Sequence, residues 1–445
     1  MILLNAFTHP EFKFLAKVSG TFKNILVLMS GTMLAQAVPV LVSPILTRQY
    51  SAFEIGNLGL FTAILNVVGP VISGRYEMAI LTPHSHREAS FVYSAAVWVA
   101  IIASVLLCVP FSLLEVFHLT NLNQVNIIFA LLPVAIFLYG YFNINNYLAI
   151  RQKNFRLVSS SRVVQSVSSS LLQIGLGFLA FLRSGLIYGY LAGQAIAALY
   201  IGSANKRTGK LRGTKYRIFK ATIKKYKDYA LINTPSTLMD SISVFAPVFF
   251  IKAGYGSEQL GYYTMAQRLI TLPTILIGQA ISQVFLQRIT SLHGDKILIK
   301  QELFKTLKWL IVIAVAGAAG IFLFSPFLFS FVFGPQWRLS GQLASIMSLS
   351  FFIRLIVNPV SSVFIATNEL KKLAAWQTAY FLLVIVLSVI GIRIFSLESM
   401  VIAYALFDCF IYSIYHRLKR KNSYTNNRQN NNKQKISCLP CCQFF

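Results

Sequence analysis

The sequence is poor in charge, and above all in acidic residues. Only 12% of its 445 residues are charged, with 13 Asp and Glu against 40 Lys and Arg, whereas 56% are hydrophobic and the mean hydropathy is +0.64. So little polar side-chain surface excludes a soluble globular protein of average composition. The basic residues lie between long apolar runs, which is typical of the loops of membrane proteins and does not indicate a nucleic acid partner. The sequence therefore predicts an all-α integral membrane protein.

The sequence also lacks the signatures of catalysis and of metal binding. Its four aspartates, Asp228, Asp240, Asp295 and Asp408, form no D-x-D pair of the kind that holds a metal and a sugar nucleotide. No H-E-x-x-H, G-x-S-x-G or P-loop pattern occurs, and the five cysteines form no spaced Cys/His set. We therefore expect no catalytic residue, no metal and no cofactor, and the chain is predicted not to be an enzyme. A membrane polysaccharide polymerase or glycosyltransferase would need a large outward loop with catalytic residues, and none is visible.

What the sequence does contain is a series of apolar runs of the length that a membrane-spanning helix needs, about 20 residues. Twelve segments qualify: 25–47, 55–73, 89–114, 126–150, 161–182, 185–202, 229–251, 260–285, 308–333, 342–366, 372–392 and 395–416. A basic segment, 203–228, separates the first six from the last six. We expect an N-terminal interfacial segment over 1–24, a first lobe over 25–202, a cytoplasmic linker over 203–228, a second lobe over 229–416 and a disordered cytoplasmic tail over 417–445.

The distribution of basic residues predicts the orientation in the membrane. One set of loops, which includes the segments Arg151 to Arg162 and Lys206 to Lys227, holds 33 of the 40 basic residues, and the opposite loops hold five. The positive-inside rule then places both termini in the cytoplasm. A weak internal repeat supports two lobes, because Tyr50 and Gly56 match Tyr255 and Gly261 at a common offset of 205.

Four charged residues fall near the middle of predicted spans, all in the second half: Asp240, Arg268, Arg354 and Asp408. A charge that faces lipid costs several kcal/mol, so these side chains predict a polar interior. Two interpretations stay open. Arg268 and Asp240 could form a structural ion pair, or the arginines could bind an anionic substrate while the aspartates serve a coupling cation.

Arg48, Arg75 and Glu77 lie near the predicted membrane faces. There they serve either as interfacial anchors or as further contacts for the substrate or the coupling ion.

Several stretches together resemble the Wzx-type flippases of O antigen and other lipid-linked oligosaccharides, in the multidrug/oligosaccharidyl-lipid/polysaccharide exporter superfamily. They are "LAQAVPVLVSPILTRQYSAFEIGNLGLF", "SGRYEMAILTP", "YKDYALINTPSTLMDSISVFAPVFF", "GYYTMAQRLITLPTILIGQAISQVF", "FSFVFGPQW" and "RLIVNPVSSVF". The resemblance matches Arg48, Arg75, Glu77, Arg268 and Arg354 to charged positions of these motifs. Asp240 departs from the pattern, which has an uncharged polar residue there.

The resemblance implies two six-helix lobes around a central cavity, working by alternating access. It implies an undecaprenyl-pyrophosphate-linked saccharide as cargo, moved to the periplasmic leaflet of the bacterial inner membrane with coupling to a cation gradient. A polysaccharide polymerase and a chain-length regulator are the protein partners it implies. Under this hypothesis Arg268, Arg354, Arg48 and Arg75 contact the anionic head group, because a guanidinium matches phosphate oxygens. Asp240, Asp408 and Glu77 are then the candidates for ion coupling or gating. A cation-coupled exporter of drugs or metabolites from the same superfamily is the alternative.

Overall fold

The protein is helical throughout the part that the computed structural model describes. These residues are 20–116, 126–179, 184–208, 216–291, 296–350, 353 and 370–425. Every regular element in these ranges is a helix, which confirms the predicted all-α fold. The expectations for the N-terminal segment before residue 20 and for the tail after residue 425 lie outside the described residues.

Six long helices in the first half correspond to the six predicted spans. They are α3 (Gly20–Gln49), α4 (Ala52–Val68), α6 (His86–Val116), α7 (Asn126–Arg151), α8 (Phe155–Phe178) and α9 (Gly185–Thr208). The short helices η1 (Gly69–Val71) and α5 (Tyr76–Ala79) lie between α4 and α6. Helix α8 packs on α9 and on α3, and α7 packs on α6 and α9.

The second half begins with a short helix in the basic linker, α10 (Tyr216–Lys225), which packs on α6. It continues with the π-helical turn η2 (Tyr229–Asn233), α11 (Thr234–Ser291), α12 (Lys296–Phe333), η3 (Pro335–Trp337), a helical segment over 338–350, α14 (Leu370–Ile394) and α15 (Leu397–Thr425). Two predicted spans, 229–251 and 260–285, are the two arms of α11 and meet at Gly256 without a loop. Gly256 has φ 86°, a backbone conformation that favours glycine, and so allows the sharp bend between the arms.

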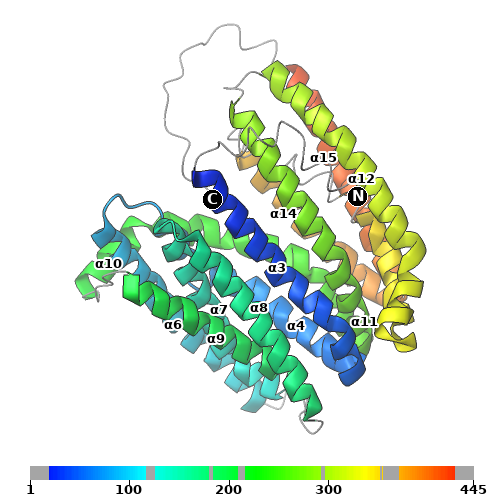
Figure 1. The fold of residues 1–445 in the computed structure, drawn as a ribbon, viewed down its shortest axis with the longest axis horizontal. Helices are drawn as coiled ribbons and strands as arrows, with labels where there is room; N and C mark the ends of the chain where they lie inside the picture. Colours follow the sequence, from blue (N-terminus) through cyan, green and yellow to red (C-terminus); the bar gives the residue numbers. More distant parts are fainter. Residues whose placement is uncertain are drawn as a thin grey trace.

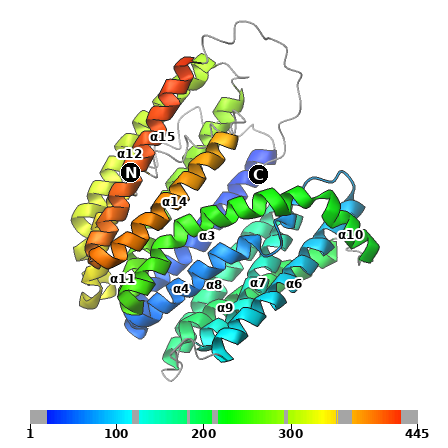
Figure 2. The ribbon, with the colours of Figure 1, turned by 180° about the vertical axis from the view of Figure 1, so that it is seen from behind.

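The helices form two groups that meet at one end of the molecule and diverge at the other. In Figure 1, α6 to α9 lie at the lower left, α12, α14 and α15 lie at the upper right, and α3 runs between them. Figure 2 shows from behind that α11 runs beside α4, and the two helices pack closely around Ser257, Gly261 and Thr264 at the start of the second arm. The first arm packs against α14 of the second group, since the Gln377 amide nitrogen of α14 donates to Asp240 over 3.3 Å and a Cβ placed on Gly254 would lie 2.7 Å from Ile392. Helix α11 therefore connects the two groups.

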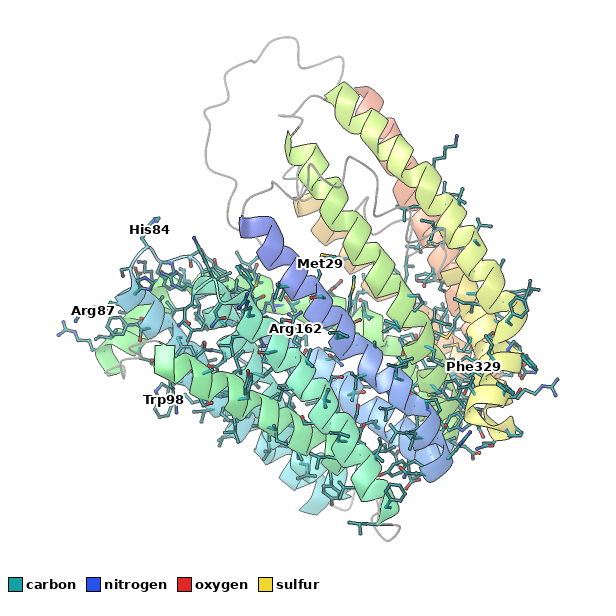
Figure 3. All side chains as sticks on the ribbon, viewed as in Figure 1. Met29, His84, Arg87, Trp98, Arg162 and Phe329 are labelled. Carbon is teal, nitrogen blue, oxygen red and sulfur yellow. The ribbon has the colours of Figure 1, made fainter. Side chains whose placement is uncertain are left out.

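The surface of these helices suits a lipid environment. Seven helical segments in the described ranges are long and apolar enough to cross a membrane. Large apolar side chains are exposed along them: Trp98, which projects from α6 in Figure 3, is 52% exposed, and Phe178 and Phe331 are 76% and 75% exposed. Apolar side chains at this level of exposure are stable in lipid and costly in water. The chain is a multi-pass membrane protein.

The two groups touch where α4 and α11 cross, through a matched pair of glycines. A Cβ placed on Gly56 would lie 1.9 Å from the Ser257 carbonyl oxygen, and one placed on Gly261 would lie 1.8 Å from the Ala52 carbonyl oxygen. Ala52 and Ser257 are related by the same offset of 205 that relates the two glycines. The backbones therefore approach closely and reciprocally, as expected for two repeats that meet near a twofold axis.

The tyrosines of the repeat also occupy equivalent places. The Tyr50 hydroxyl donates to the Gln173 carbonyl oxygen of α8 over 2.8 Å, and the Tyr255 hydroxyl donates to the Phe395 carbonyl oxygen after α14 over 2.7 Å. Tyr50 thus ties the end of α3 to α8, and Tyr255 ties the end of the first arm of α11 to the residue that directly follows α14.

Candidate functional site

A cavity of about 690 Å³ lies between the first group of helices and α11. Its wall is formed by α3, α4, α7, α8 and α9 on one side and by both arms of α11 on the other. The volume falls in the range of pockets that hold small molecules, about 300–1,000 Å³.

Two arginines line this cavity from opposite groups of helices. Arg162 comes from α8, and its guanidinium Nη1 donates to the Thr32 hydroxyl of α3 over 2.7 Å. Figure 3 shows Arg162 where α8 passes α3. Arg268 comes from the second arm of α11, and its side chain is partly exposed to the cavity. Two permanent cations thus face one membrane-embedded space.

Neither arginine is neutralised by a described carboxylate. Among the described residues that line the cavity, none is an aspartate or a glutamate. The ion pairs within 4.0 Å in the described ranges are Arg75–Glu77 and Lys225–Glu88. Among the described residues, the charge of the cavity is therefore positive and uncompensated, which favours an anion.

The rotation of α8 explains why Arg162 reaches the cavity. The helix begins at Phe155 because the side chain of Asn154 caps it by accepting from the Leu157 amide over 3.2 Å. Polar residues then follow at intervals of three and four along one face, and all of them line the cavity: Arg162, Gln165, Ser166, Ser169, Ser170 and Gln173. Part of this polar stripe also packs on α9, since the Gln165 amide nitrogen donates to the Gln194 side-chain oxygen and the Gln173 amide nitrogen donates to the Leu186 carbonyl oxygen.

The sequence interpretation missed Arg162, which it counted among the basic residues of a cytoplasmic loop. That placement was wrong, because α8 starts six residues earlier than the predicted span 161–182 and puts Arg162 about two turns inside the helix. The periodic run of Ser, Gln and Arg in "SSSRVVQSVSSSLLQ" was the signal that could have identified it.

The structure places the other predicted head-group residues apart from this cavity. Arg48 is exposed at the end of α3 and does not line it. Arg75 lies in the break between α4 and α6, 3.2 Å from the Glu77 carboxylate, which is 3% exposed and also accepts from the Ser73 hydroxyl. Arg75 has φ 60°, an uncommon conformation for a residue with a side chain. Arg354 lies outside the described residues.

The two aspartates that were predicted near the middle of spans, Asp240 and Asp408, both contact α14. The Gln377 amide nitrogen donates to Asp240 over 3.3 Å, and the Tyr380 hydroxyl donates to Asp408 over 2.9 Å. Gln377 and Tyr380 are one turn apart on α14, so one helix contacts both carboxylates. Asp240 therefore has Gln377 as its partner, and no ion pair joins it to Arg268 in this arrangement. No group of three or more His, Cys, Asp or Glu side chains that could hold a metal occurs among the described residues.

Comparison with protein families and curated proteins links the chain to polysaccharide biosynthesis. A family model described as "Polysaccharide biosynthesis protein" matches residues 45–342. A teichuronic acid biosynthesis protein of Bacillus subtilis is 20% identical over 36% of this chain and 33% of its own length, so the chain spans about a third of that relative. An uncharacterised membrane protein in the cps region of Klebsiella pneumoniae is 19% identical over 74% of this chain and 67% of its own.

Comparison with solved structures identifies the fold. The lipid II flippase MurJ in an inward closed conformation superposes with a TM-score of 0.71 and 16% identity over 89% of this chain and 87% of its own. A multidrug resistance MATE family transporter of the MOP superfamily in an inward-facing conformation superposes with a TM-score of 0.64. It is 15% identical, and the match covers 91% of this chain and 99% of its own. The predicted all-α membrane fold is confirmed, and its helices are arranged as in these two proteins.

Proposed function

We propose that this chain, which belongs to the polysaccharide biosynthesis protein family, is a flippase for undecaprenyl-pyrophosphate-linked oligosaccharide. Its cargo is the repeat unit of O antigen or of another surface polysaccharide, and it moves this unit from the cytoplasmic to the periplasmic leaflet of the inner membrane. The similarity to a protein named a lipid II flippase supports a lipid-linked cargo, and the similarity to a teichuronic acid biosynthesis protein supports a saccharide.

The observation that carries this proposal is a pair of guanidiniums in one cavity, those of Arg162 and Arg268, with no carboxylate partner among the described residues. A pyrophosphate must cross about 30 Å of hydrocarbon, where its charge is strongly disfavoured without a partner. Arginine stays charged and offers a planar fork of donors that matches phosphate oxygens. The glycan then passes through the cavity while the prenyl chain stays in lipid.

The arginines also favour this cargo over that of a cation-coupled drug or metabolite exporter. A cavity for cationic drugs would need acidic groups, and the described lining has arginines instead. The assignment as a transporter rather than a polymerase or glycosyltransferase rests on the family and the fold.

Orientation and energy coupling follow from the remaining charges. The basic loops and α10 face the cytoplasm with both termini, so the crossing of α4 and α11 faces the periplasm and the cavity belongs to an inward-directed arrangement.

Asp240, Asp408 and Glu77 are the proposed sites of cation coupling or gating, because carboxylates within a polar membrane interior can bind a proton or sodium ion. Arg48, Arg75 and Arg354 are proposed to meet the head group in other conformations of the cycle. A polymerase and a chain-length regulator would use the delivered unit.

The test is reconstitution in liposomes with a fluorescent undecaprenyl-pyrophosphate oligosaccharide, followed by measurement of its arrival in the opposite leaflet under an imposed cation gradient. Loss of charge-assisted hydrogen bonds worth about 1.5–3 kcal/mol predicts that Arg268→Gln and Arg162→Gln each weaken cargo binding about 10- to 150-fold. The control is Arg87→Gln, which removes an exposed arginine on α6 outside the cavity. Absence of translocation by the wild type under every gradient would contradict the proposal, and normal binding by both cavity variants would remove the arginines from it.

A further inference from the structure

We infer that the carboxamides of Gln36 and Gln267 recognise the sugar that is joined directly to the pyrophosphate, and so select which saccharide the protein moves. This inference rests on the proposed function. It assigns the two cavity arginines to the head group and the two carboxamides to the saccharide.

The cavity is rich in carboxamides, but most of them are already engaged with protein. The Gln165 amide nitrogen donates to the Gln194 side-chain oxygen, and the Asn66 amide nitrogen donates to the Thr62 carbonyl oxygen over 2.8 Å. The Gln173 amide nitrogen donates to the Leu186 carbonyl oxygen over 3.0 Å. These groups hold α8 to α9 and stabilise α4, and they have a structural role without any ligand.

Gln36 and Gln267 differ because neither side chain makes a hydrogen bond with any residue in the described ranges, although both line the cavity. A carboxamide offers two donors and one acceptor oxygen, and leaving them unpaired in a membrane interior is costly. Both side chains are partly exposed to the cavity, where water or a ligand can satisfy them. They are free to bind cargo in a way that the engaged carboxamides are not.

Their positions fit the sugar next to the head group. Gln267 directly precedes Arg268, and Gln36 lies one turn along α3 from Thr32, which holds the guanidinium of Arg162. A pyrophosphate bound by the two arginines would therefore bring its attached sugar within reach of both carboxamides. Paired donors and acceptors suit the hydroxyl and acetamido groups of a sugar, which also donate and accept.

The described lining holds no acidic group, which narrows the class of ligand to one that presents uncharged hydrogen-bonding groups to the carboxamides. Hydroxyls and amides bind without charge, so the carboxamides discriminate by the placement of hydrogen-bonding groups. A site built to pair such groups rejects a ligand that lacks them, because its own polar atoms are then left unsatisfied. The arginines, in contrast, contribute the same affinity to every prenyl pyrophosphate.

The experiment compares two probes in nanodiscs: undecaprenyl pyrophosphate without a sugar, and undecaprenyl pyrophosphate carrying one N-acetylhexosamine. We expect the wild type to bind the sugar-bearing lipid more tightly, and Gln36→Leu and Gln267→Leu each to lose about tenfold for that lipid alone. Binding of the sugar-free lipid should stay within about twofold of the wild type. Arg268→Gln should weaken both probes.

Controls separate recognition from folding. Gln36→Asn keeps a carboxamide and should recover part of the lost affinity, and melting temperatures identify any variant that does not fold. Gln336→Leu removes an exposed carboxamide on η3, outside the cavity, and should bind both probes as the wild type does. Equal affinities of wild type and both leucine variants for the sugar-bearing lipid would overturn the inference while leaving the flippase proposal intact. Failure of the wild type to bind either probe would instead contradict the flippase proposal.

Discussion

Replacing Gly261 with alanine tests the crossing of α4 and α11. The added Cβ would lie 1.8 Å from the Ala52 carbonyl oxygen and 2.6 Å from the carbonyl carbon, both of them backbone atoms. Ordinary contact requires about 3.5 Å, so the two helices must separate by roughly 1.5 Å at this point. No side chain can rotate away to relieve the clash. We expect a cost of about 1–3 kcal/mol, as measured for overpacked interiors.

This cost falls only on arrangements in which the two groups of helices meet at this end. Under the proposed transport cycle, the substitution should shift the population away from this arrangement by about 5- to 150-fold. The assay is disulfide cross-linking of Asn57→Cys with Ser257→Cys in a background without native cysteines. In the native protein the Ser257 hydroxyl lies 2.8 Å from the Asn57 side-chain oxygen, so the pair reports contact across the crossing.

The matched control is Gly175→Ala in α8, where nothing lies within 4 Å of the added Cβ. There alanine should stabilise the protein by up to about 1 kcal/mol through helix propensity and leave cross-linking unchanged. Gly261→Ala that cross-links and melts as the parent does would refute the reasoning, since the helices would then tolerate a methyl group at their closest approach.

Two further predictions concern stability. Burial raises the pKa of the Glu77 carboxyl above its usual value despite the nearby Arg75 and Ser73, so the folded protein keeps this proton where the unfolded chain has lost it. The free energy of unfolding should therefore fall as pH rises from about 4.3 to the raised pKa, and the slope of melting temperature against pH should flatten in Glu77→Gln; identical slopes would contradict this. Tyr50→Phe and Tyr255→Phe each remove one hydrogen bond to a carbonyl and should each lower stability by about 0.5–1.5 kcal/mol in denaturant titrations. A loss at only one of them would argue against their equivalence in the two halves.

The candidate site was only partly predictable from the sequence. Arg268 was identified because a permanent charge inside an apolar run needs a polar surrounding wherever the helix lies. Arg162 was missed because it stands near the end of its apolar run, where a loop and a helix explain its charge equally well. The alternative of an Arg268–Asp240 pair could not be decided either, since both residues lie at similar predicted depth. Asp240 instead has Gln377 of α14 as its partner.

The sequence by itself determined the helical membrane fold, the approximate limits of its spans and the matched glycines and tyrosines of its two halves. These features depend on hydrophobicity and spacing along the chain, which are local properties. Only the tertiary structure decided that Arg162 and Arg268 share a cavity, that Gly56 and Gly261 meet, and that Gln36 and Gln267 face the cavity with no described partner. Such relations depend on how each helix is rotated and against which neighbour it packs. That choice is made by side-chain contacts between residues far apart in the chain.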